Sequence, residues 1–137
     1  MVHPRTRRIY VVDTETTGVD LEAGHTLFEV ALVNLDDPLD RHQWFFALTM
    51  DEIAKADPKC LTGFGNYNGR LLLQRNVIPP DYQARKRAIN QVFDYLDGSI
   101  LAAVNPTFDD KFLAAFVASY GLQRVWDYHL LDIWTYS

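Results

Sequence analysis

The chain has 137 residues, of which 48% are hydrophobic and 13% aromatic, as in an ordinary globular protein. This length predicts a single domain over residues 1–137 that folds without disulfides or a structural metal. With 13 Lys and Arg against 18 Asp and Glu, the net charge of −5 excludes a general electrostatic attraction to nucleic acid. One cysteine and no long apolar run in the sequence predict a cytoplasmic protein that does not bind membranes.

The first third of the chain predicts three strands. Residues 9–12 form a short β-branched and aromatic run that ends at the polar sequence DTETTG of residues 13–18. Residues 26–35 and 42–48 predict two more strands, with Asp36, Asp37 and Pro38 as a turn between them. Because short connections favour pairing between successive strands, we expect an antiparallel meander.

The remainder of the sequence predicts alternating helices and strands. A short helix is expected over 50–56 and a longer helix over 84–96. Segment 59–76 is expected to be an irregular solvated loop, and the alternative is that its cations Lys59, Arg70 and Arg75 guide a nucleic-acid strand. A buried strand over 100–104, a helix over 107–120 and a strand over 126–133 follow. The sequence therefore predicts an α/β fold with a mixed five-stranded sheet, three antiparallel strands and then parallel strands, flanked by helices.

Two carboxylates stand where the first strand ends. Asp13 and Glu15 alternate along an extended segment, so both side chains are expected on one side of the sheet. Converging carboxylates repel each other unless a proton or a hard cation lies between them. The pair therefore indicates a cation site, and the alternative is an ordinary polar end of a strand.

A second polar cluster, from Asn105 to Asp109, follows the predicted buried strand and opens a helix. Loop residues at the ends of neighbouring strands gather at one edge of a sheet, which places this cluster near the first. The alternative is helix capping, with Asn105 or Thr107 as the cap and the acids favoured by the helix dipole. Capping alone does not explain acidic residues at the ends of two strands.

Together these segments resemble a known family. VVDTETTG at 11–18, LFEVALV at 27–33 and NPTFDDKFL at 105–113 are similar to the first two motifs of the DEDD superfamily of 3′–5′ exonucleases, which includes the proofreading subunit of bacterial DNA polymerase III. The resemblance implies an RNase H-like fold and a two-metal phosphodiesterase. Asp13, Glu15 and Asp109 match the catalytic acids that bind two Mg²⁺ or Mn²⁺ ions in the family.

The same resemblance implies a substrate and partners. The substrate would be the 3′ end of a single-stranded nucleic acid, with DNA favoured over RNA, and a polymerase or another replication protein is an expected partner. Bound cations, rather than the net charge of the protein, would attract the polyanion. Thr16, Thr17, Asn105 and Phe108 match substrate-binding positions, although the two threonines also suit a simple turn before Gly18.

The third motif of the family is not matched convincingly. Tyr128 and Asp132 have the spacing of its Tyr form, but too few residues separate Asp132 from Asp109 for the helices that the family places there. Residues 126–133 are more typical of a strand, and His129 has the wrong spacing for the His form. His3, His25 and His42 are expected to be surface or strand residues rather than bases.

This mismatch leaves two functional interpretations. In the first, the chain is a 3′–5′ exonuclease domain that is C-terminally truncated relative to the family. In the second, it is a catalytically impaired fragment or a degenerate relative that binds nucleic acid or a partner protein.

Overall fold

The computed structural model describes residues 7–136. The strands are β1 (Ile9–Thr16), β2 (Leu27–Asn34), β3 (Asp37–Phe46), β4 (Val77–Ile78), β5 (Ile100–Ala103) and β6 (Leu130–Asp132). The helices are α1 (Met50–Lys55), α2 (Pro58–Thr62), α3 (Tyr67–Leu73), α4 (Tyr82–Leu96) and α5 (Pro106–Ala118). None of these helices is long and apolar enough to cross a lipid bilayer.

The strands form one mixed sheet in the order β4-β3-β2-β1-β5-β6. β1, β2 and β3 pair as the predicted antiparallel meander, whereas β5 pairs parallel to β1, and β6 parallel to β5. The sheet has six strands rather than the five expected, because β4 adds two residues parallel to β3. A two-residue strand shows no alternation in a sequence, which explains why it was not predicted.

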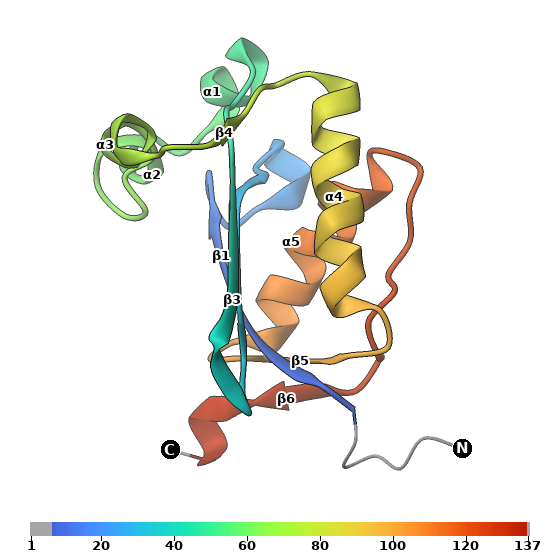
Figure 1. The fold of residues 1–137 in the computed structure, drawn as a ribbon. Helices are drawn as coiled ribbons and strands as arrows, with labels where there is room; N and C mark the ends of the chain where they lie inside the picture. The colour runs from blue at the N-terminus through green and yellow to red at the C-terminus, as the bar shows by residue number, and fades with distance from the viewer. Residues whose placement is uncertain (1–6, 137) are drawn as a thin grey trace.

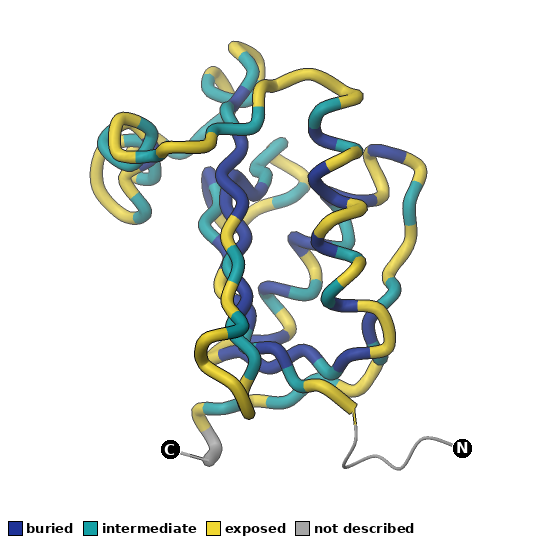
Figure 2. Tube along the Cα trace, in the orientation of Figure 1, coloured by how far each residue is buried: buried dark blue, intermediate teal, exposed yellow. Residues whose placement is uncertain are grey.

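Helices α4 and α5 cover one face of the sheet (Figure 1). Both helices alternate between buried and exposed residues (Figure 2), and their buried residues share one core cluster with those of the strands. Ala88, Ile89 and Val92 of α4 form the apolar stripe that the sequence predicts, and they join Leu113 and Phe116 of α5 in the main core. This layer fixes α5, and therefore the segment that carries Asp109, against β1.

The other face carries α2 and α3 over one end only (Figure 1). Tyr67 of α3 packs edge-on against Phe28 and stacks on Phe45, and its hydroxyl accepts a hydrogen bond from the Leu48 amide at 2.8 Å. The expectation of an irregular loop over 59–76 was therefore wrong. Glycine and asparagine make up five of the seven residues 63–69 and lower the helix propensity there, so α3 depends on the aromatic contacts of Tyr67.

The start of α5 also differs from the prediction. The helix begins at Pro106, since proline suits the first helical position, and Asn105 takes the N-cap position. The Asn105 side chain makes no capping hydrogen bond, and Thr107, the other expected cap, lies inside the helix. Asp110 accepts hydrogen bonds from Arg124 and Trp126.

Candidate active site

Asp13 and Glu15 lie on the face of β1 that points away from α4 and α5. Val12 and Thr14, the residues that alternate with them, are buried toward the helices. Asp13 stands opposite Ala31 of β2, and Glu15 stands opposite Glu29. The register shifts directly after Glu15, an irregularity of the kind often found beside active sites.

Asp109 comes from the first turn of α5 and is buried. One oxygen of its carboxylate accepts hydrogen bonds from the Thr14 amide at 3.2 Å and from the Thr14 hydroxyl at 2.6 Å. Thr14 lies between Asp13 and Glu15 in the chain, so these two bonds attach the second acidic cluster to the first. The segments that the sequence singled out therefore meet at one place on the sheet.

The three carboxylates influence one another. Burial raises the pKa of Asp13, Glu15 and Asp109 above their ordinary values. The charge of Asp13 raises the pKa of Glu15 and of Asp109 further, whereas the hydrogen bonds from Thr14 lower the pKa of Asp109. A partly buried group of like charges has this signature, and a bound cation would relieve it.

The donor chemistry of these acids fits hard divalent cations, because carboxylate oxygens are the ligands that Mg²⁺ and Mn²⁺ prefer. Within residues 7–136, however, no three His, Cys, Asp or Glu side chains are gathered closely enough to hold a metal ion. Asp13 is exposed on the sheet face while Asp109 is buried against Thr14. The acids thus influence one another electrostatically, but they do not form a complete metal-binding site.

Two charged residues, Glu29 and Arg70, stand beside the acids, and the sequence singled out only Arg70, as one of the cations of segment 59–76 that could guide a strand. Glu29, on β2, is only 3% exposed, and Arg70 of α3 forms an ion pair with it. The charge of Arg70 lowers the pKa of both Asp13 and Glu15, which places the guanidinium within electrostatic reach of the acids. A lone acid inside the apolar strand LFEVALV was the available signal for Glu29, whereas the sequence offered Arg70 only as one cation of segment 59–76, with no link to the acids.

The connection between α2 and α3 reaches Glu15. Gly65 has a φ of +72°, and a Cβ atom on it would lie 2.8 Å from Glu15 Oε2. The backbone of this connection therefore lies against the carboxylate, which only a glycine allows without displacing it. Phe64, which precedes Gly65 in this connection, is 78% exposed.

The two threonines of the first motif differ in role. Thr17 is fully buried, its hydroxyl accepts a hydrogen bond from the Thr26 amide at 2.9 Å, and its own amide binds the Thr26 carbonyl. This favours the turn interpretation for Thr17, because it has no surface to offer a nucleotide. Thr16 is half-buried and donates from its hydroxyl to the Gly18 carbonyl at 2.7 Å, so its surface remains partly accessible.

The predicted substrate residues of the second motif lie at the start of α5. Asn105 is exposed, and its side chain makes no hydrogen bond to the helix that it begins. Phe108 is half-buried, and its ring packs on Phe112 with centroids 4.6 Å apart. Both residues lie within four positions of Asp109 and remain candidates for substrate contact.

The histidines of the described segment are engaged away from the acids. His25 accepts a hydrogen bond from the Asp20 amide, His42 pairs with Asp40, and His129 pairs with Asp127. His3 lies outside the described residues. Asp132 belongs to strand β6, as expected for a strand rather than a third motif, and Tyr128 is 82% exposed just before it.

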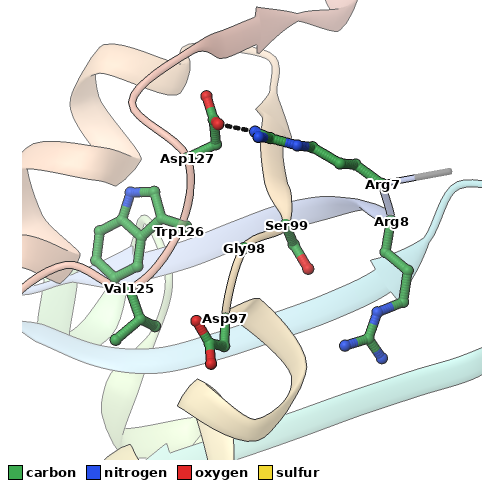
Figure 3. A pocket seen from close by; sticks show the side chains of 8 residues that line it. All are labelled: Arg7, Arg8, Asp97, Gly98, Ser99, Val125, Trp126 and Asp127. Carbon is green, nitrogen blue, oxygen red and sulfur yellow. Dashed lines mark hydrogen bonds and ion pairs between the residues drawn. The ribbon is translucent and has the colours of Figure 1, made fainter. Parts of the chain in front are cut away.

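A cavity of about 510 Å³ lies at the opposite end of the parallel strands from the acids. Figure 3 shows its lining, where Arg7 reaches across to Asp127 beside the backbone of Gly98 and Ser99. Ligands of open α/β sheets bind outside the carboxyl ends of the strands, and this cavity is at the amino ends. The acids, rather than the cavity, mark the candidate site.

No protein-family model matches the sequence, and no curated protein matches it. Solved structures of exonuclease I do match the fold. The E. coli enzyme in complex with a dT13 oligonucleotide superimposes with a TM-score of 0.62 at 14% identity over 86% of this chain and 25% of that one. A product-bound exonuclease I gives 0.60 at 14% identity over 85% and 26%. The zinc-bound E. coli complex with single-stranded DNA gives 0.56 at 12% identity over 90% and 26%.

This chain spans about a quarter of the length of those enzymes, and identities this low establish the fold alone. They do not distinguish the proofreading branch, and they give no support to a polymerase partner. The mixed sheet, antiparallel and then parallel, with helices on its faces matches the RNase H-like architecture. The chain therefore has an RNase H-like fold similar to that of exonuclease I.

Proposed function

We propose that the chain is a metal-dependent 3′–5′ exonuclease domain that hydrolyses terminal phosphodiester bonds of single-stranded nucleic acid, DNA in preference to RNA. One observation carries the proposal. In an exonuclease-like fold, Asp109 is hydrogen-bonded to Thr14, the residue between Asp13 and Glu15, so acids from two distant segments lie within electrostatic reach of one another.

Asp13, Glu15 and Asp109 would hold two Mg²⁺ or Mn²⁺ ions. The chemistry supplied there is Lewis-acid activation of water and of the scissile phosphate. The hydroxyl of Thr14 fixes one oxygen of Asp109 and leaves the other for a cation. Binding cations would require the carboxylates to draw together, since the described residues hold no finished cluster.

The surroundings of the acids suit a single strand. Phe64 is an exposed aromatic ring next to the contact between Gly65 and Glu15, and rings of this kind stack on unpaired bases. Asn105, Phe108 and Thr16 border the acids from the other motif and from the end of β1. These residues would hold the terminal nucleotide while the carboxylates hold the cations.

The test is cleavage of a 5′-labelled single-stranded oligonucleotide in Mn²⁺, with an EDTA control. Stepwise shortening from the 3′ end that falls to the EDTA level in Asp13→Ala supports the proposal. Asp36→Ala is the matched control, because Asp36 is an exposed acid in the turn between β2 and β3. Cleavage that survives in Asp13→Ala contradicts the assignment of the site.

A second function is a binding module without catalysis. Two observations favour it: the acids of the described segment are not gathered into a metal cluster, and its histidines lie elsewhere. Retained binding of the oligonucleotide in EDTA, with no shortening in Mg²⁺ or Mn²⁺, would select this function over the enzyme.

A further inference from the structure

Glu29 is a carboxylate buried inside an apolar strand. Its side chain is 4% exposed and points to the same sheet face as Glu15, its direct neighbour across β1 and β2. Burying a charge is costly unless the charge is paired and hydrogen-bonded. Arg70 donates to Oε1 and Gln43 to Oε2, so both oxygens of Glu29 are already occupied.

Arg70 is held by Glu29 through only part of its guanidinium. Its guanidinium gives Glu29 one hydrogen bond from Nη2, and 37% of the side chain stays exposed. Arg85 in the core provides the contrast, with 5% exposure and four hydrogen bonds, to Glu52, Tyr120 and the Ala47 carbonyl. The core arginine is a structural crosslink, whereas the Arg70 side chain stays partly exposed. The Arg70 Nε is buried without a hydrogen-bond partner among residues 7–136.

Arg70 places a positive charge among acids that would otherwise repel a polyanionic substrate. Asp13, Glu15, Asp109 and Glu29 crowd negative charge where a polyanion would have to arrive. Arg70 forms an ion pair with Glu29, which stands directly opposite Glu15, so its positive charge lies beside these acids. A guanidinium can bind a carboxylate along one edge and a phosphate along another, which a lysine cannot do.

We propose that Arg70 is a substrate-binding residue that contacts a phosphate of the single strand beside the acids, and that Glu29 is the positioning residue that holds it there. This inference rests on the proposed function and extends it to a phosphate-binding group on α3. The fixed charge of Arg70 would orient the strand independently of any bound cation.

The experiment measures binding of a short fluorescein-labelled oligothymidylate by anisotropy in EDTA across a range of salt concentrations. For Arg70→Gln we expect about tenfold weaker binding and a slope of log K against log salt that is shallower by about 0.7, the value for one phosphate contact on a single strand. Arg70→Lys should retain the slope, because it retains the charge. Arg87→Gln is the matched control, since Arg87 is exposed on α4 behind the opposite face of the sheet.

The role of Glu29 is tested by a double-mutant cycle. Glu29→Gln should weaken binding when Arg70 is present and have no further effect in the Arg70→Gln background. Circular dichroism checks each fold, and where Arg70→Gln does not fold, the double variant, which leaves no unpaired buried charge, takes its place in the salt titration. Equal weakening by Glu29→Gln in both backgrounds would contradict the positioning role.

The outcomes distinguish a failure of this inference from a failure of the proposed nuclease function. If Arg70→Gln gives the same slope as Arg87→Gln while the wild-type chain still shortens DNA in Mn²⁺, the inference fails and the proposed function stands. If the wild-type chain neither binds nor shortens the oligonucleotide, both are overturned.

Discussion

Each charged carboxylate at the candidate site lowers the stability of the fold. Burial and mutual repulsion raise the pKa of Asp13, Glu15 and Asp109, which means that the folded chain disfavours their charged forms. Sites that must bind charged ligands commonly carry such a cost. The acids therefore make the stability of this protein sensitive to pH and to added cations.

Asp13→Asn should raise the melting temperature at pH 7 in EDTA, because the amide removes one of the repelling charges. We expect at most about 1 kcal/mol, equivalent to ~3 °C, since solvent screens the exposed Asp13 side chain. For a carboxyl whose pKa is raised on folding, stability falls as pH rises from its ordinary value of 3.8 through the raised value, so the variant should lose part of this decline.

The measurement is thermal unfolding followed by circular dichroism between pH 3 and pH 7, with Asp36→Asn as the control. Added Mn²⁺ should raise the melting temperature of the wild type more than that of Asp13→Asn, because a ligand that binds only the folded state stabilises it. Equal stabilisation of the two proteins by Mn²⁺ would argue against Asp13 as a cation ligand.

The pKa of Asp40 is shifted in the opposite direction from the pKa of the acids at the candidate site. The Tyr10 hydroxyl donates to its carboxylate at 2.5 Å, and Asn34 and His42 also bind it. These hydrogen bonds lower the pKa of Asp40 to about 2, while burial and the neighbouring Asp40 charge raise the pKa of Tyr10 to about 12. The pair contributes stability that is complete above pH 3.8 and lost as the pH falls toward 2.

Tyr10→Phe should lower the free energy of unfolding by about 1–2 kcal/mol at pH 7, as expected for a lost hydrogen bond to a charged acceptor. The difference from the wild type should shrink toward pH 2, where Asp40 becomes protonated in both proteins. Urea unfolding at the two pH values provides the measurement, and a loss that is independent of pH would contradict the role of Asp40.

At the scale of elements, the connection between α2 and α3 joins the helical lobe to the acids. Gly65 approaches Glu15 closely with a positive φ, and Tyr67 anchors the following helix in the aromatic cluster of β2 and β3. Because the group next to Gly65 is the flexible end of a side chain, a bulkier residue would displace the carboxylate rather than the backbone.

Gly65→Ala should therefore reduce nuclease activity and affinity for Mn²⁺ about tenfold or more, while costing about 1 kcal/mol of stability for its positive φ. Gly121→Ala is the control, since Gly121 has a φ of +74° and open space around it. It should show the same loss of stability with unchanged activity. Equal activity of the two variants would mean that the connection does not constrain Glu15.

At the scale of the whole molecule, Arg85 joins the helices α1, α4 and α5 to the end of strand β3. From α4 it binds Glu52 of α1, the Ala47 carbonyl after β3 and the Tyr120 hydroxyl after α5, and its guanidinium lies over the Phe116 ring. The hydrogen bonds from Arg85 lower the pKa of Glu52, so this carboxylate stays charged in its half-buried position. Four elements thus depend on one buried cation.

Arg85→Met should destabilise the fold by about 3–5 kcal/mol, because it leaves the Glu52 carboxylate without its buried partner. Arg124→Met is the comparison, since the Arg124 ion pair with Asp110 is half exposed and should be worth at most about 1 kcal/mol. Urea unfolding of both variants tests this difference, and similar losses for the two would contradict the crosslinking role.

The sequence predicted those parts of the fold that carry a local signal. The apolar run before Asp13, the strand from Thr26 to Leu35 and the helix over 84–96 are periodic and long enough to identify. The α2–α3 lobe was missed because contacts with distant aromatic residues hold it in place. The ion pair between Glu29 and Arg70 joins residues 41 positions apart, and a single sequence contains no pattern that links them.

The hydrogen bonds between Thr14 and Asp109 span 95 residues of the chain. The meander of β1, β2 and β3 is local, whereas the pairing of β1 with β5 and the docking of α5 must close a long loop. Contacts between distant segments form slowly, because their loop entropy is lost before they contribute stability. We therefore expect the acids to meet only after the meander has formed, so that a newly made chain cannot assemble this site until α5 has been synthesised.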